Sequence, residues 1–245
     1  MIFFSTYVYA FAKQHGSAWG SEFKRELREG PRSSLPCVRT YAAATAVDDC
    51  MLQVSGPSRI PQARSQSAGM LLRSPRADIW VCCDDDVEAG PDVIARLVRA
   101  ARTTRGVVSA PCLQRSTDRA EGDPGILNIR MHAEPAFTHG DEFLLASITL
   151  TGFGLVALHR DGVQAIADQH PELVVDLDEN GTSFPALFAE QVGNRKWYGE
   201  DNSFCLRANR AKVPIHALCS ATVVHAGRRC ELEVFEGVPY FRVHD

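Results

Sequence analysis

Short apolar runs alternate with amphipathic segments along this chain, and that alternation predicts an α/β fold. Residues 1–6 form a first apolar run, and residues 79–83 lack polar alternation, which is typical of a strand buried on both faces of a sheet. Residues 60–73 and 91–103 have helical periodicity, and each carries a proline in its first turn. We predict a mostly parallel central sheet flanked by helices.

The pattern between these elements is less regular. It predicts a helix over 21–29, a turn over 30–36, a short buried strand over 107–111 and a helix from about 200 to 212. Residues 40–54 stay open, because their Ala-rich first part favours helix and their last residues favour strand. Residues 117–140 are rich in Gly, Pro, His and charge, and we expect them to be mobile without ligand and to close over the bound substrate.

Length and charge bound the class of protein. A chain of 245 residues that is 45% hydrophobic is large enough for a full core, and no repeat or linker divides it. We therefore expect one domain over 1–245. The net charge is −4 and the pI is about 6.1, so no basic field favours nucleic-acid binding.

The cysteines and the N-terminal residues indicate where in the cell the protein is expected to work. Eight cysteines are present, but Cys82 and Cys83 lie in the predicted buried strand and no Cys/His spacing indicates zinc. Reduced thiols in a cytoplasmic protein explain the cysteines more simply than disulfides do. Residues 1–12 imitate a signal sequence, yet they lack a basic start and a core strand explains them equally well. We expect a soluble protein whose membrane contact is at most peripheral.

Three adjacent carboxylates, Asp84, Asp85 and Asp86, directly follow the buried strand. This is the carboxyl end of the strand, where open α/β sheets place their ligands. Such a cluster repels itself unless a cation offsets the charge, and Mg²⁺ or Mn²⁺ takes oxygen ligands of this kind. In an extended segment Asp84 and Asp86 would share a face. A solvated acidic turn is the alternative interpretation.

A second cluster places two aromatic residues, Trp197 and Tyr198, just before Gly199, Glu200 and Asp201 at a predicted helix start. Acids in the first turn of a helix gain from its dipole, so capping alone explains them about equally well. An aromatic wall beside a carboxylate is also a common way to hold a sugar ring and raise the basicity of the carboxylate.

Two further segments carry weaker signals. Glycines in the run Thr151-Gly152-Phe153-Gly154, ahead of an apolar strand, would let a ligand or another loop approach the backbone closely. His225 ends a short predicted strand, where it is placed to join the acidic cluster. A lone histidine is more often structural than a ligand.

Taken in order, these segments resemble the GT-A glycosyltransferases, the nucleotide-sugar-dependent transferases with a metal-binding DxD motif. The resemblance is carried by Asp84-Asp85-Asp86, Thr151-Gly152-Phe153-Gly154, Gly199-Glu200-Asp201, Phe204-Cys205-Leu206-Arg207-Ala208, His225 and the segment Ile60-Pro61-Gln62-Ala63-Arg64-Ser65, in which Ser65 replaces the Asn of the family's "ARN" helix start. It covers residues 60–225. The first 55 residues match poorly, and Asp48 or Asp49 is only a loose candidate for the family's uracil-contacting Asp.

The resemblance implies a GT-A, Rossmann-like fold with a nucleotide-binding half over 1–110 and an acceptor and catalytic half over 111–245. It implies transfer of a sugar from a UDP- or GDP-sugar to a hydroxyl of a glycan, lipid, protein or small molecule, with inversion. The implied residues are Asp201, or less favourably Glu200, as the base; Asp86, His225 and Asp84 at Mn²⁺ or Mg²⁺; and Arg64, Asp84, Asp85, Gly152, Trp197 and Tyr198 at the nucleotide sugar.

Three other classes compete. A GT-A-like nucleotidyltransferase needs a Gly-rich basic loop after the first strand, which residues 5–13 do not provide. A haloacid-dehalogenase phosphatase carries DxD on its first strand with a Thr after it, whereas here the acids come at residue 84 and Val87 follows. An inactive carbohydrate-binding or scaffold relative is the non-enzymatic alternative.

Overall fold

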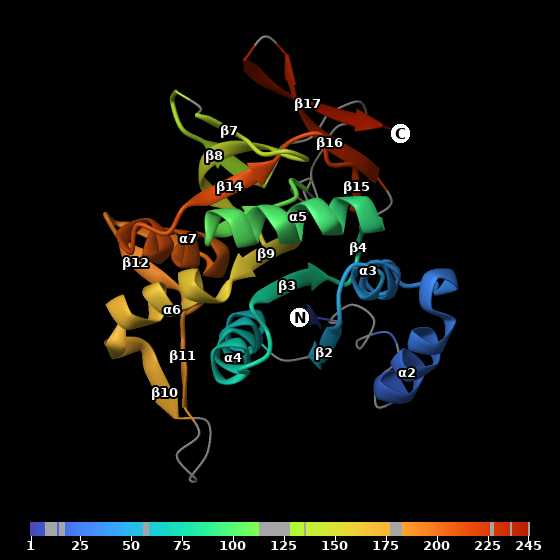
Figure 1. Cartoon of the computed structure of the whole chain (residues 1–245). Helices are drawn as coiled ribbons and strands as arrows, with labels where there is room; N and C mark the ends of the chain where they lie inside the picture. Colours follow the sequence, from blue (N-terminus) through green and yellow to red (C-terminus); the bar gives the residue numbers. More distant parts are fainter. Residues whose placement is uncertain are drawn as a thin grey trace.

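The computed structural model of the chain describes residues 1–7, 14, 18–55, 59–112, 128–134, 136–176, 183–225, 228–235 and 237–244. Within them, a nine-stranded sheet forms the centre and helices cover both of its faces (Figure 1). Eight of its strands lie side by side in the order β2 (Cys50–Ser55), β1 (Ile2–Tyr7), β3 (Ile79–Asp84), β9 (Leu155–His159), β5 (Val107–Ser109), β14 (Ile215–Leu218), β8 (Leu144–Thr151) and β6 (Ile129–Met131). The ninth strand, β7 (Phe137–His139), also pairs with β8.

Strand direction in this sheet is mixed. Strands β2, β1, β3, β5 and β14 run the same way, as the sequence predicted, whereas β9 and β8 run against them. The sheet draws strands from both halves of the chain. Because β9 is antiparallel to β3, the start of β9 lies at the same edge as the end of β3.

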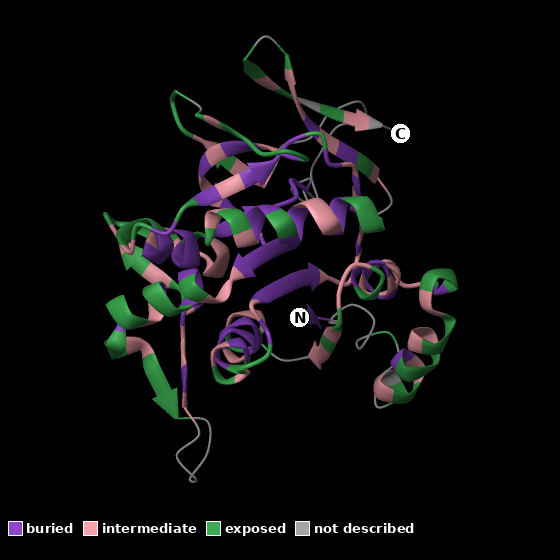
Figure 2. Cartoon of the chain, viewed as in Figure 1, coloured by how far each residue is buried: buried purple, intermediate pink, exposed green. Residues whose placement is uncertain are grey.

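The helices form one layer on each face of the sheet. One layer holds α3 (Pro36–Thr45) and α5 (Pro91–Thr104), and the other holds α4 (Ile60–Arg73), α6 (Arg160–Gln169) and α7 (Glu200–Arg210). Helix α2 (Trp19–Glu29) lies outside these layers and continues into a 3₁₀ turn, Gly30–Arg32. Strand β3 is buried along nearly its whole length (Figure 2). Both of its faces are covered, because Cys83 packs on the α3–α5 side and Cys82 on the α4 side.

Several predicted elements have the expected bounds. Helix α4 covers 60–73 as predicted, and α5 ends one residue later than predicted. The open segment 40–54 contains both expected structures, since α3 ends at Thr45 and β2 begins at Cys50. Part of the predicted excursion, 117–127, lies outside the described residues. Its later part contributes β6 and β7, which pair with β8 instead of forming an irregular loop.

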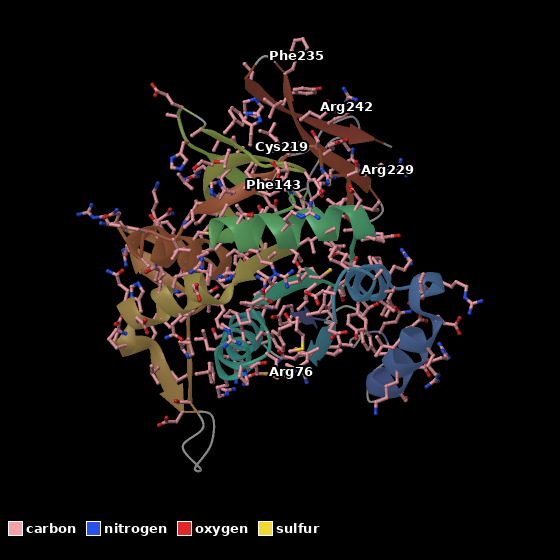
Figure 3. The ribbon with its side chains drawn as sticks, in the orientation of Figure 1. Arg76, Phe143, Cys219, Arg229, Phe235 and Arg242 are labelled. Carbon is pink, nitrogen blue, oxygen red and sulfur yellow. The ribbon has the colours of Figure 1, made fainter. Side chains whose placement is uncertain are left out.

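Three smaller sheets surround the central one. They consist of β10 (Val174–Asp176) with β11 (Ser183–Pro185), β12 (Gln191–Gly193) with β13 (Lys196–Tyr198), and a four-stranded sheet of β17 (Val238–His244), β16 (Arg228–Phe235), β15 (Val223–His225) and β4 (Val87–Glu88). A 3₁₀ turn, Pro171–Leu173, precedes β10. The β16–β17 hairpin projects from the body, with Phe235 near its tip and Arg242 and Arg229 further along it (Figure 3).

All eight cysteines are free thiols, and seven of them are buried. In the described part of the chain, no helix is both long and apolar enough to cross a membrane.

Candidate functional site

The candidate site lies at the edge of the central sheet where β1 and β3 end and β9 begins. The register pairs Tyr7, the last residue of β1, with Asp84, the last residue of β3. The backbone N–H of Asp84 donates to the carbonyl oxygen of Gly154 at 2.8 Å. This bond ties the acidic segment to the start of β9, so two of the sequence-predicted segments meet here.

Arg64 is the centre of this site. It lies in the second turn of α4, and its guanidinium contacts acids from two distant elements. Nη2 lies 3.0 Å from Asp84 Oδ1, and Nη1 lies 3.4 Å from Glu200 Oε1 and closer still to Asp201 Oδ1. One cation thus joins the end of β3 to the first turn of α7, and we call Arg64, Asp84, Glu200 and Asp201 the Arg64 cluster.

The guanidinium of Arg64 is held in a fixed position by aromatic rings as well as by charge. It lies 5.6 Å from the ring centroid of Tyr7 and 5.5 Å from that of Phe153. The residue is 2% exposed, and no described residue pairs with its Nε atom. Burial lowers the pKa of Arg64, but Asp201 and Asp84 outweigh it and hold the pKa well above its ordinary value. Arg64 is therefore a permanent cation at the site.

The same burial changes the acids. Burial raises the pKa of Asp201, the charge of Arg64 opposes it, and Glu200 and Asp84 raise it again, so the pKa is about 6. The N–H of Phe153 donates to Asp201 Oδ2 at 3.2 Å and fixes the carboxylate. Burial also raises the pKa of Asp84 above its ordinary value, against the charge of Arg64. A carboxyl with a pKa near 6 is suited to accept a proton close to neutral pH.

Asp86 and His225 form a second contact beside the Arg64 cluster. His225 Nε2 lies 3.2 Å from Asp86 Oδ2. Strand β15 pairs with β4, with His225 opposite Val87, and this pairing brings the two side chains together. The sequence therefore correctly placed His225 near the acids, although the two come from different segments.

The sequence predicts that the three acids lie on one extended segment, and this prediction is wrong. Asp84 ends β3, and Asp85 and Asp86 form the turn between β3 and β4. Their carboxylates consequently face different partners. Asp84 contacts Arg64, Asp86 contacts His225, and the charge of Asp85 acts on the Cys37 thiol, whose pKa is raised chiefly by burial.

The predicted metal ligands are only partly assembled. Asp86 and His225 are in contact, and their charges act on the carboxyl of Asp84, but Asp84 Oδ1 itself faces Arg64. Among the described residues, no three His, Cys, Asp or Glu side chains come together in a group that could hold a metal ion.

Gly152 and Gly154 are explained by close packing of neighbouring segments. A Cβ at Gly152 would lie 2.7 Å from the side-chain nitrogen of Asn128, and one at Gly154 would lie 3.0 Å from Cys112 Sγ. Asn128 also accepts from the N–H of Gly152 through its carbonyl oxygen at 2.6 Å. Of the two alternatives, a neighbouring segment therefore accounts for the glycines without a ligand.

Trp197 and Tyr198 lie on β13, outside the Arg64 cluster. Trp197 is 69% exposed, and Tyr198 is half-buried. The loose candidates Asp48 and Asp49 precede β2 and so lie at the opposite edge of the sheet from the acids. Asp48 binds Arg102 at 2.7 Å and the N-terminal ammonium at 3.4 Å. These two contacts account for Asp48 without a ligand, and its position at the opposite edge separates it from the candidate site.

An open cleft of about 820 Å³ adjoins the Arg64 cluster and shares Glu200 with it. Its walls are the N-terminal end of α4, the β10–β11 hairpin and the segment 186–190. The sequence contains no signal for this cleft, because its walls come from α4 and from segments far from α4 along the chain, which only the fold brings together. The sequence also missed Tyr7, although its position at the end of the first strand pointed to the same edge of the sheet.

Comparisons with known proteins do not place the chain in a family. No protein-family model matches it, and no curated protein matches it. The crystal structure of A197 from STIV is similar at 11% identity and a TM-score of 0.49, covering 92% of this chain and 85% of that one. The crystal structure of GalNAc-T7 with UDP, GalNAc and Mn²⁺ is similar at 11% identity and a TM-score of 0.48, covering 97% of this chain and 44% of that one.

Proposed function

We propose that the chain is a glycosyltransferase that moves a sugar from a nucleoside-diphosphate sugar to an acceptor hydroxyl, with a divalent metal. The observation that carries the proposal is the Arg64 cluster, in which the acids after β3 and the acids that open α7 meet around one buried cation. These are the two acidic segments on which the resemblance to GT-A glycosyltransferases rests. A helix cap alone would not need a partner 137 residues away in the sequence.

The donor atoms at Asp86 and His225 fit Mn²⁺ or Mg²⁺. These ions are often held by one or two protein ligands, with water and phosphate oxygens of the substrate completing the shell. One carboxylate and one imidazole 3.2 Å apart match such a partial set, and the imidazole favours Mn²⁺. A metal at this place would stabilise the charge on the departing nucleoside diphosphate.

Asp201 is the proposed base. In the transfer, the acceptor oxygen bonds to the anomeric carbon, the bond from that carbon to the diphosphate oxygen breaks, and the hydroxyl proton passes to Asp201. Arg64 keeps the carboxylate ionised and oriented, and the N–H of Phe153 fixes its second oxygen. Attack from the side of Asp201, opposite the departing diphosphate, gives inversion.

The free thiols bear on where the protein works. All eight cysteines are free thiols and seven are buried, and on that ground we propose a reducing compartment such as the cytoplasm.

Asp86→Ala is expected to abolish the gain in nucleotide affinity that Mn²⁺ provides. The variant removes a proposed ligand and leaves the central sheet intact, so unfolding should remain cooperative. Isothermal titration with UDP and GDP, with and without Mn²⁺, measures the effect. Asp92→Ala, which removes an exposed carboxylate at the start of α5, is the matched control and should bind as the parent does. Equal Mn²⁺-dependent binding by the Asp86→Ala variant would refute the metal assignment.

A further inference from the structure

The cleft beside the Arg64 cluster is large enough for a ligand of its own. Its volume of about 820 Å³ lies within the range of roughly 300–1,000 Å³ typical of small-molecule sites. It is an open cleft, with Ile60 and Pro61 of α4 on one side and Val175 of the β10–β11 hairpin on another. Glu200 lines the cleft, and its carboxylate contacts the same Nη1 atom of Arg64 as the carboxylate of Asp201 does, so a ligand that reaches Glu200 would lie near the proposed base.

The charged side chains of the cleft are predominantly acidic. In the described part of the chain, the lining contains the carboxylates of Asp176, Glu190 and Glu200 and one cation, Arg59. Asp176 and Glu190 are exposed to solvent, so both are available to a ligand. Arg64 offsets part of the charge of Glu200 from the buried side. The field in the cleft therefore attracts positive charge and repels phosphate.

The apolar part of the lining is aliphatic. The one aromatic side chain among the described lining residues, Phe184, is 6% exposed, because it packs against Gly69 of α4. The exposed Trp197 is not among the lining residues. Sugar rings are commonly held on open aromatic faces, and this cleft presents an aliphatic wall with carboxylates around it instead.

We infer that this cleft binds the acceptor and that the acceptor carries an ammonium or guanidinium group close to the hydroxyl that receives the sugar. The inference rests on the proposed transferase function for its reaction, but the binding itself does not depend on the donor. Asp176 and Glu190 would pair with the cation, the aliphatic wall would contact its carbon chain, and the hydroxyl would lie toward Asp201. Acceptors that bear phosphate would be excluded by the same carboxylates.

The test uses two fluorescent peptides that each contain one serine, flanked in one peptide by two lysines and in the other by two glutamates. It also uses two sugars, glucosamine, which carries an ammonium group, and N-acetylglucosamine, which is uncharged. Fluorescence anisotropy measures peptide binding to the full chain at low and high salt, and competition measures the sugars. We expect the lysine peptide to bind at least tenfold tighter than the glutamate peptide, with the difference shrinking as salt rises. Competition by glucosamine alone would identify the amino sugar as the source of the cation, whereas failure of both sugars would identify the peptide.

Glu190→Lys should remove most of the preference for the lysine peptide. Glu134→Lys, at an exposed carboxylate between β6 and β7, makes the same charge change outside the cleft and should leave the preference intact. Equal affinities for the two peptides, or equal effects of the two variants, would overturn the inference. If nucleotide titration with Mn²⁺ succeeds while no cationic probe binds, the inference fails and the transferase proposal stands. If cationic probes bind and no nucleotide does, the transferase proposal fails alone.

Discussion

Asp201→Asn should lower sugar transfer by about 10²-fold or more while leaving donor affinity nearly unchanged. The substitution is close to isosteric, so it removes the base without changing the volume of the side chain. The amide oxygen can still accept from the N–H of Phe153, whereas the hydrogen bond from Arg64 is lost. Release of UDP or GDP from nucleotide sugars in the presence of acceptor measures transfer, and isothermal titration of the nucleotide measures affinity.

Glu200→Gln is the matched control for this prediction. Glu200 lies 3.4 Å from Arg64 and has no contact with the N–H of Phe153, so its loss should reduce transfer less than the loss of Asp201. The opposite order would move the base to Glu200, and no effect from either variant would leave the two acids as a helix cap.

The pH dependence of transfer follows from the same carboxyl. Because the pKa of Asp201 is about 6, the base is ionised above that pH and protonated below it. Transfer by the parent protein should therefore fall as the pH drops through about 6. The residual activity of the Asp201→Asn variant should not show this fall near pH 6.

Arg64→Met should destabilise the fold by about 3 kcal/mol at pH 8, because it leaves the carboxylates of the Arg64 cluster without their buried cation. Asp84 and Asp201 retain some solvent contact, which places the effect at the lower end of the usual range for broken buried pairs. Chemical denaturation measures the change. The matched control is Arg73→Met, at another arginine of α4, which removes one hydrogen bond to the backbone carbonyl of Ser183. It should lower the free energy of unfolding by about 1 kcal/mol or less.

The sign of the pH effect separates this explanation from a simple packing loss. Without Arg64 the pKa of Asp201 rises further, because the charge of Arg64 now lowers it. A folded-state pKa above the unfolded value favours folding at low pH, so the penalty of Arg64→Met should shrink as the pH falls through the raised pKa. Adding Asp201→Asn should also recover part of the lost stability. A penalty that is the same from pH 5 to pH 8 would show that packing, not charge, is responsible.

The local elements were predictable because their signals are local. Helix α4 has its proline in the first turn and its period over 60–73, and β3 shows its burial in an unbroken apolar run. The direction of β9 was not predictable in this way, since an apolar strand has the same pattern in either direction. The β16–β17 hairpin was missed because charged residues interrupt its apolar positions along an exposed surface.

The candidate site was predictable as a set of residues but not as an arrangement. The acids after β3 and at the start of α7 stand out in the sequence, yet nothing local shows that they share Arg64. The partners of Arg64 lie 20 and 137 residues away, and the folding of α4 and α7 onto one face brings them together. The sequence assigned Arg64 to the nucleotide, whereas the structure places it between the acids. Its role toward a bound nucleotide stays a prediction.

The turn that carries Asp85 and Asp86 is also the place where the chain leaves one sheet and enters another. Strand β3 belongs to the central sheet, and β4 belongs to the four-stranded sheet that contains His225 and the C-terminal hairpin. A ligand held between Asp86 and His225 would therefore link the turn that leaves the central sheet to strand β15 of the four-stranded sheet. Backbone amides of β15 and β16 should exchange their protons with solvent more slowly when Mn²⁺ and nucleotide are added together, and hydrogen–deuterium exchange would record that protection well away from the substrate.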